Sequence, residues 1–470
     1  MSPDSFDLAA LPSLTDANDV VKAFAANPAF RAAEWEELTT EDDPHRRPVR
    51  PDDLEWLDYS KPMPAPKALK LSALLGHRML RNVYDAGHVH LPPRRTEVNE
   101  VSARQFHSAQ NRILGALARP ILERHLFTLL DELRPSLSTV DSETITGTVL
   151  DYHEQRRSEP GRAFDVALRT RGRKEAASFM LLQLSAFRPA AHTAFGQAAT
   201  GEYDTGHPAL RGLLLEDYRG WADRAPAYRE LLAGASLCPT AGAYWQLYLG
   251  TSLGRGNLVH HLAGDPSKIF ELAGAFVHEK IDRAATGARF TEVFADGLGY
   301  SGAFFTPDAA LTASGLRELL GRLLPPIAEN FGTEALAAFH RGFSDARWFA
   351  ETWDADLATQ LDWADKIEEY QEKAEKIDQY LTNENIEVDL DTFVETNEET
   401  STTHVHNEHR LVMIETGQMH FWNNVTHKIQ LNQGDKLLIP VSRLHGSTVL
   451  SGSCTYHQPI IPEDMLQQFV

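Results

Sequence analysis

Three histidines near the C-terminal end of the chain have the spacing of a metal site. His404 and His406 stand two apart in TTHVHNEHR, and His445 follows in GDKLLIPVSRLHGS. Residues two apart on a β-strand share a face, so the first pair should point the same way, and a second strand can bring His445 beside it. Three imidazoles hold one transition metal ion and leave up to three positions for water, O2 or a chelating substrate. We therefore predict a mononuclear site on these histidines, with Fe(II) as the first choice and Mn, Ni, Cu and Zn as open alternatives.

Two neighbouring residues are candidates for catalysis. Arg443 lies two residues before His445 and is expected at the mouth of the site, where a guanidinium would bind a carboxylate. His457, in YHQPII, is expected to face inward and to contact the substrate or support the ligands. The competing interpretation is a metal-free sugar-binding or structural barrel, because a chain with 20 histidines produces H-x-H by chance.

The segment that carries these histidines has the pattern of a small β-barrel. After Asn385, short runs of apolar and polar residues, many of them alternating, are separated by turn residues such as Gly417 and Gly434. This spacing is typical of a double-sheet jelly roll, predicted over residues 385–470.

The composition changes sharply near residue 366. Residues 366–470 contain one alanine and two arginines, whereas the chain before them is rich in both. Apolar residues at three-to-four spacing predict all-α structure in two domains, residues 1–140 and 141–365, and a charged connector helix over residues 366–384. The fold class is thus multidomain α + β, and the break is compatible with a natural or an engineered fusion.

Charge and cysteine content narrow the class of partner. The formal net charge of −21 disfavours nucleic acid and anionic membranes and favours a small molecule. No apolar run approaches the ~18 residues that cross a bilayer. The first residues lack the pattern of a signal peptide, and the two cysteines are far apart in the sequence, so a cytoplasmic protein without disulfides is expected.

The histidine segments resemble the two cupin motifs. H-x-H is followed by Gly417 and then by G-D-x-x-x-I-P-x-x-x-x-H, while Arg410 stands where the first motif usually has an acidic ligand. The resemblance therefore implies a cupin with three histidine ligands.

The whole chain resembles the N-nitrosourea-forming enzymes of streptozotocin biosynthesis. The matching segments are NPAFRAAEWEEL with DDPHRRPVRPDDLEWLDY, AYWQLYLGTSLGRGNLVHHLAG, and HVH with RLHG. The resemblance implies a homodimer with an N-terminal helical dimerisation domain, a haem-oxygenase-like di-iron domain and an iron cupin. In that family the di-iron domain hydroxylates two guanidine nitrogens of an N-methylarginine, and the cupin rearranges the product with O2 to form an N–N bond.

The di-iron part of the resemblance fails at the ligands. The family carries H-x3-D-x2-H on its last ligand helix, and residues 145–365 contain no such motif. The positions where the resemblance places ligands hold residues that are mostly unable to bind iron: Ala191, Asp217, Ala227 or Tyr228, Lys280 or Glu279, Asp308, Thr312 and Gly315. We therefore expect a helical domain without a di-iron centre, in which Lys280 neutralises Asp217 and Asp308.

These inferences favour one function and leave two rivals. The favoured function is an iron cupin that uses O2 to rearrange an N-hydroxylated guanidine amino acid, supplied by a separate N-oxygenase, with formation of an N-nitroso group. The rivals are a cupin dioxygenase or isomerase acting on another chelating metabolite, and a non-catalytic scaffold for an active di-iron enzyme.

Overall fold

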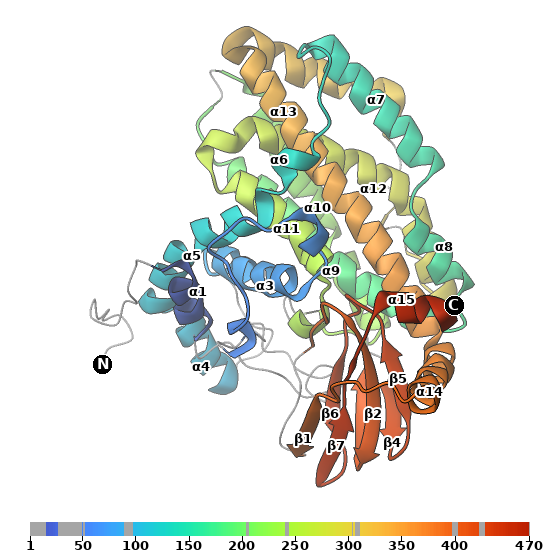
Figure 1. Cartoon of the computed structure of the whole chain (residues 1–470). Coiled ribbons are helices and arrows are strands. Elements are labelled where there is room, and N and C mark those ends of the chain that lie inside the picture. The colour runs from blue at the N-terminus through green and yellow to red at the C-terminus, as the bar shows by residue number, and fades with distance from the viewer. Residues whose placement is uncertain are drawn as a thin grey trace.

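In the part of the chain that the structure describes, helices extend up to residue 383 and strands follow from residue 392, which confirms the predicted combination of a helical part and a C-terminal β part (Figure 1). The structure is a computed structural model. It describes residues 16–26, 49, 52–88, 97–203, 206–239, 244–302, 304–305, 311–396, 403–422 and 428–469, with backbone only at residues 97–99 and 101–102.

The first helices lie together at one side of the molecule (Figure 1). They are α1 (Ala17–Ala25), α3 (Leu71–Asp85), α4 (Glu97–Phe106), α5 (Ala109–Phe127) and α6 (Leu130–Leu133), with short 3-10 turns η2 (Asp52–Leu54) and η3 (Ala65–Lys67). Asp16 and Ser108 cap α1 and α5 by accepting from free backbone N–H groups of the first turn.

A bundle of longer helices forms the centre of the molecule, which we call the helical body. It comprises α7 (Ser142–Ser158), α8 (Arg162–Arg169), α9 (Arg173–Ala198), α10 (Pro208–Gly234), η4 (Trp245–Leu247), α11 (Gly250–Ala263), η5 (Pro266–Lys268), α12 (Ile269–Leu298) and α13 (Ala313–Asp365), which is interrupted at Gly332. Two glycines let α12 and α13 cross closely. A Cβ at Gly274 would lie 1.9 Å from the carbonyl oxygen of Phe339, and one at Gly342 would lie 1.8 Å from that of Glu271.

The apolar core continues across the predicted domain boundary at residue 140. One buried cluster contains Phe24 and Leu126 from the first helices together with Val259, Phe276 and Phe343 from the helical body. The two helical regions therefore bury their apolar surface against each other.

The C-terminal segment forms two antiparallel sheets. One contains β1 (Thr392–Thr396), β7 (Ser453–His457), β2 (His409–Thr416) and β5 (Lys436–Ile439) in that order, with β8 (Ile460–Ile461) also beside β2. The other contains β4 (Lys428–Asn432), β3 (Gln418–Trp422) and β6 (Gly446–Val449). Gly417 and Gly434 have φ values of 89° and 91° at the turns that the sequence predicted.

Side chains from both sheets meet in one core. Val412 and Tyr456 of the first sheet pack with Phe421 and Leu431 of the second. This is the double-layered arrangement expected from the alternating pattern, and we call it the barrel. The chain then ends in the short helical turns α15 (Glu463–Leu466) and η7 (Gln467–Phe469).

The connector helix covers the barrel. Helix α14 (Ile367–Asn383) runs along β5 (Figure 1). Its buried residues Ala374, Ile377 and Leu381 pack on Leu411 and Leu438 of the sheet. The helix is therefore amphipathic and extends the barrel core, whereas its charge pattern had suggested a solvated connector.

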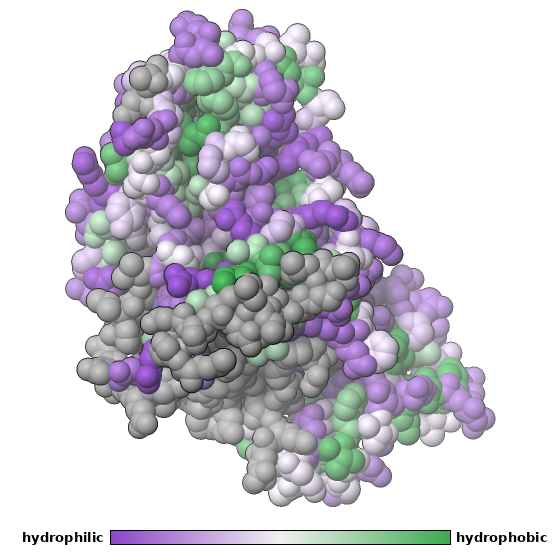
Figure 2. Space-filling view, turned by 90° about the vertical axis from the view of Figure 1, so that its left-hand side faces the viewer, coloured by the Kyte–Doolittle hydropathy of each residue, from purple (hydrophilic) through white to green (hydrophobic). Residues whose placement is uncertain are grey.

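The side of the molecule turned to the viewer in Figure 2 is mixed in character, with hydrophilic residues over most of its described upper part and apolar residues gathered in a short band across the middle. In the part of the chain that the structure describes, no helix combines the length and apolar character needed to cross a membrane. Both cysteines are free thiols, with Cys454 buried inside the barrel.

Candidate metal centre

The three predicted histidine ligands meet at one place in the structure. His404 and His445 exchange backbone hydrogen bonds of 3.0 and 3.1 Å as an isolated antiparallel bridge, and the backbone oxygen of His406 accepts from the N–H of Ser442. The three ring centroids lie 4.5–4.9 Å apart. One nitrogen of each ring lies within 4.8 Å of the other two, so the group can close on a single metal ion.

The hydrogen bonds of the rings leave nitrogens directed at this centre. Nδ1 of His445 lies 2.9 Å from the carbonyl oxygen of Arg443, to which it donates, so Nε2 keeps its lone pair. Nε2 of His445 and Nε2 of His406 are both buried without a hydrogen-bond partner among the described residues. Buried nitrogens are rarely left unpaired, and a bound metal ion would satisfy both.

Burial also keeps the ligands neutral. It lowers the pKa of His445 well below the ordinary value, and burial together with the neighbouring histidines lowers the pKa of His406. Neutral imidazole is the form that binds metal. Phe421 stacks on His445 with centroids 5.1 Å apart and planes 16° apart, which fixes the plane of that ring.

Residues of α3, of the turn before it and of the helical body hold the segment that carries His404 and His406. Arg78 of α3 is buried and donates to the carbonyl oxygen of Thr403 at 2.7 Å and to its hydroxyl at 3.0 Å. The N–H of Thr403 donates to the side chain of Gln246, and the Thr403 hydroxyl donates to the carbonyl oxygen of Gln246. Lys70 donates to the carbonyl oxygen of Asn407 at 2.8 Å, on the other side of the two histidines.

The segment that carries His445 is held in the same way. The side-chain amide of Gln360, on α13, donates to the carbonyl oxygen of Leu444 at 2.8 Å and accepts from its N–H at 3.0 Å. A second buried cluster joins Val405 and Leu444 to aromatic residues of the helical body. The centre therefore lies where the barrel meets the helices, and both elements position it.

The structure corrects the predicted placement of Arg443. Its side chain is buried, and its guanidinium lies 3.3 Å from a carboxylate oxygen of Asp356 on α13. Asp356 also accepts from the hydroxyl of Thr251. Burial raises the pKa of Asp356, and Arg443 acts against that rise. Arg443 thus joins the barrel to the helical body instead of standing at an open mouth.

The structure also corrects the orientation of His457. On β7, Cys454 and Tyr456 point into the core, so His457 belongs to the opposite face. Its Nδ1 lies 2.9 Å from the hydroxyl of Thr392, and its Nε2 lies 3.5 Å from Glu415. The expected inward direction is wrong because His457 is next to Tyr456 in sequence, and neighbouring residues on a strand point to opposite faces.

Other predicted non-ligands lie away from the centre. Arg410 donates to Asp391 at 2.6 Å and to the carbonyl oxygen of Gln458. His409 lies 2.7 Å from Glu463 and accepts from the N–H of Val441. His427 lies outside the described residues.

A network of charges occupies the helical body where the resemblance implied two irons. Asp217 of α10 lies 2.5 Å from Arg283, 2.6 Å from Nδ1 of His192 and 3.7 Å from Lys280. Burial alone would raise the pKa of Asp217, but Arg283 and His192 hold it below its ordinary value. The expected pairing of Lys280 with Asp217 is confirmed, and Arg283 is the closer partner that the sequence reasoning missed.

Glu279 and Asp282 are matched by a second set of cations. Arg255 lies 3.1 Å from Glu279 and 2.9 Å from Asp282, and Arg156 lies 2.8 Å from Asp282. Despite burial, the charge of Arg255 lowers the pKa of Glu279 to about 2. Guanidinium groups thus take the charge-compensating role that metal ions would have.

The other positions where the resemblance places di-iron ligands hold residues with structural contacts. Ala191 is buried and apolar, and Thr312 caps α13 by accepting from the N–H of Gly315 at 3.1 Å. The hydroxyl of Tyr228 lies 2.6 Å from that of Ser185. Asp308 lies outside the described residues. Among the described residues, no group of three or more potential ligands forms around Asp217, Glu279 or Asp282.

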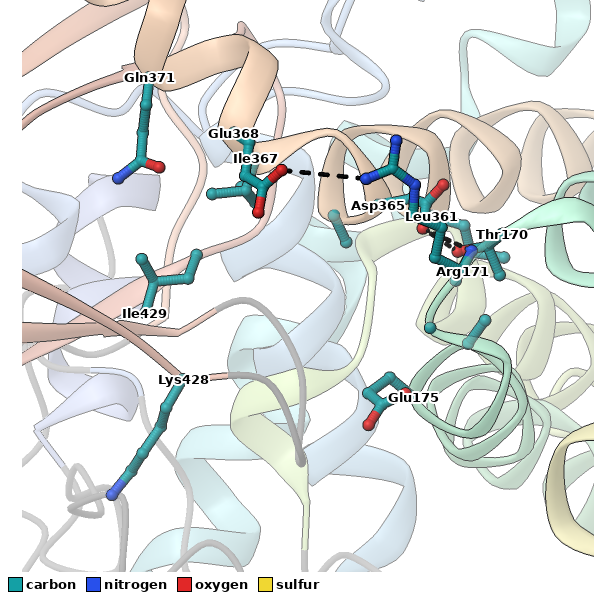
Figure 3. A pocket seen from close by; sticks show the side chains of 13 residues that line it. Thr170, Arg171, Glu175, Leu361, Asp365, Ile367, Glu368, Gln371, Lys428 and Ile429 are labelled. Atoms are coloured by element: carbon teal, nitrogen blue, oxygen red, sulfur yellow. Dashed lines mark hydrogen bonds and ion pairs between the residues drawn. The ribbon is translucent and has the colours of Figure 1, made fainter.

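A separate cleft of about 560 Å³ opens between α9, α13, α14 and β4 (Figure 3). Several of its polar residues are paired with each other. Asp365 accepts from the hydroxyl of Thr170 and from the backbone N–H of Arg171. The side chain of Arg171 lies 3.9 Å from Glu368. The three histidines are not part of its lining.

Comparisons with known proteins relate the chain as a whole to one enzyme. No family model matches the chain. The chain is 25% identical over 446 residues to the nitrosourea synthase of Streptomyces achromogenes subsp. streptozoticus, a match that covers 93% of this chain and 94% of that protein. Similarity over nearly the full length of both chains supports a homologue of that enzyme, and therefore an enzyme.

Proposed function

We propose that the protein is an O2-dependent, N-nitroso-forming enzyme whose chemistry takes place at His404, His406 and His445. The observation that carries the proposal is the convergence of three imidazoles, two of which have a buried Nε2 with no hydrogen-bond partner among the described residues. The similarity to a nitrosourea synthase supports oxygen-dependent N-nitroso chemistry in general.

Iron is the metal that we propose for this centre. Fe(II) on three imidazoles keeps positions open and would supply the electrons needed to activate O2. The protein itself contributes neutral ligands, a fixed plane for His445 and a buried wall formed by the helical body.

The substrate that we propose is an amino acid whose guanidine nitrogens are already hydroxylated. Adjacent N–O groups can chelate a metal with open positions. The helical body pairs Asp217, Glu279 and Asp282 with arginines, so we assign N-hydroxylation to a separate N-oxygenase.

The decisive test uses the full-length, Fe(II)-loaded protein. Supplied with O2 and an N,N′-dihydroxylated methylarginine, it should consume O2 and release an N-nitroso product detected by mass spectrometry, while unmodified arginine and methylarginine remain intact. The His404→Ala protein is the matched control. Iron-loaded protein that leaves every hydroxylated guanidine unchanged would refute N–N bond formation and favour a cupin oxygenase acting on another chelating metabolite. A purified protein without metal at the barrel, and unable to take it up, would favour the scaffold role.

A further inference from the structure

A second group of potential metal ligands lies among helices outside the barrel. Asp85 is the last residue of α3, His88 follows in the turn after it, and His260 lies on α11. One ligand atom of each lies within 4.8 Å of the other two. Among the described residues, only this group and the three barrel histidines meet that criterion.

His260 points to a ligand independently of that spacing. Its side chain is 3% exposed, and its Nε2 is buried with no hydrogen-bond partner in the described part of the chain. The ring lies between two others, 5.4 Å from Tyr84 and 5.1 Å from His88 by centroid. A buried polar atom without a partner is costly, and a metal ion would provide the missing interaction.

Asp85 is already oriented toward the group. Arg81, one turn earlier on α3, donates from Nε to Oδ1 of Asp85 at 2.9 Å, and Nδ1 of His88 lies 3.8 Å from the same oxygen. A carboxylate has about four lone-pair sites, so the geometry of the group can accept both Arg81 and a metal ion. Arg81 also donates to the carbonyl oxygen of Ala186 on α9, which fixes its own position. It thus resembles the outer partners that orient metal-binding carboxylates.

We propose that Asp85, His88 and His260 bind a second divalent transition metal ion, independent of the barrel centre. Two imidazoles and one carboxylate suit zinc, iron or cobalt, and disfavour Mg²⁺ and Ca²⁺, which prefer oxygen ligands. The side chains of Asp85 and His88 are 19% and 25% exposed, so an ion can reach the site from solvent. The ion would tie α3 to α11 and thereby join the first helices to the helical body.

The test isolates this site by removing the barrel centre. Full-length protein carrying His404→Ala and His406→Ala, stripped of metal, is titrated with Co²⁺ and followed by its visible d–d absorption and by calorimetry. We expect one Co²⁺ per chain. Adding His88→Ala should weaken binding at least tenfold and remove the d–d bands, whereas His107→Ala, a histidine outside the group, should leave both unchanged.

We choose His88 for the substitution because its side chain is partly exposed, so the variant should still fold. If the His260→Ala protein does not fold, because that residue is buried, His88→Ala decides the matter from a partly exposed turn. Absence of Co²⁺ binding in the folded double variant would overturn the proposal. So would equal affinity of the His88→Ala and His107→Ala proteins. Neither result bears on the barrel, whose own metal is measured in the unaltered protein.

Discussion

His445 is the most constrained of the three barrel histidines. Its backbone is bridged to His404, its Nδ1 donates to Arg443, and its ring is stacked on Phe421. These contacts direct Nε2 before any ion arrives, which lowers the cost of ordering the ligand.

Replacing one ligand should therefore empty the barrel centre. In His445→Ala, and equally in His404→Ala, metal measured by mass spectrometry of the purified protein should fall to background at that site, and turnover should be lost. His457→Gln is the matched control, because that ring faces Thr392 outside the core, and it should retain the metal. Full metal retention in His445→Ala would contradict the assignment.

Arg283 and Lys280 should differ in their effect on stability. Arg283 is 6% exposed and lies 2.5 Å from Asp217. Arg283→Met removes the closest cation from a buried carboxylate and should lower the free energy of unfolding by about 3–5 kcal/mol. Lys280 is 29% exposed and 3.7 Å away, so Lys280→Met should cost about 1 kcal/mol or less. Urea unfolding of both variants measures the difference, and equal costs would show that Arg283 is not the main partner.

At the scale of elements, α3 and α13 act as external braces for the metal ligands. Arg78 on α3 holds Thr403, and Gln360 on α13 holds Leu444. Each braced residue immediately precedes a predicted ligand, so a shift of either helix moves an imidazole.

Removing the contact between Arg78 and Thr403 should weaken metal binding without unfolding the barrel. Arg78→Met should lower metal affinity about 10–100-fold, the effect typical of outer-shell changes, and Arg78→Lys should restore part of it. The control is Arg134→Met, which breaks the ion pair between Arg134, after α6, and Asp345 on α13. Metal competition with a chelator gives the affinities; indistinguishable values for Arg78→Met and Arg134→Met would argue against a bracing role.

Local patterns predicted the ligands but not their supports. The period of two along a strand predicted that His404 and His406 point the same way. The residue types at Gly417 and Gly434 predicted the turns that the structure shows there. The contact between Arg78 and Thr403 spans 325 residues, and no sequence period encodes it. His457 was misassigned because the residue types of β7 alone do not show which of its two faces is inward, and the structure turns Cys454 and Tyr456 into the core.

At the scale of the whole molecule, the helices and the barrel share apolar surface. Val405, Trp422 and Leu444 pack with residues of the helical body, and α14 completes the far side of the barrel with Ile377.

Two truncated chains would separate these contributions. Residues 366–470 keep α14 and should fold, while residues 385–470 lose its apolar face and should be markedly less stable in urea. Both lack the braces and should bind metal at least tenfold more weakly than the full chain. Native affinity in either truncated chain would show that the barrel organises its site alone.

Stability of the full chain should fall in mild acid. Burial lowers the pKa of His192 to about 4 and that of His77 to about 3, so between pH 6.5 and 4 the unfolded chain binds protons that the folded chain does not. From pH 7 to 5, His192 alone should remove roughly 2 kcal/mol of unfolding free energy. His192→Asn, which can still donate to Asp217, should show a drop smaller by that amount; an equal drop in both proteins would contradict the prediction.

The packed contact between the helices and the barrel limits how the gene for this chain could evolve. Arginines and a lysine balance the buried acids of the helical body, so the packing of this body does not depend on a bound metal ion. A gene for this chain could not discard the helices, since Arg78, Gln246 and Gln360 act on the barrel from outside it. If the barrel carries out the proposed reaction, selection on that reaction would preserve the shape of the helical body even without chemistry in that body.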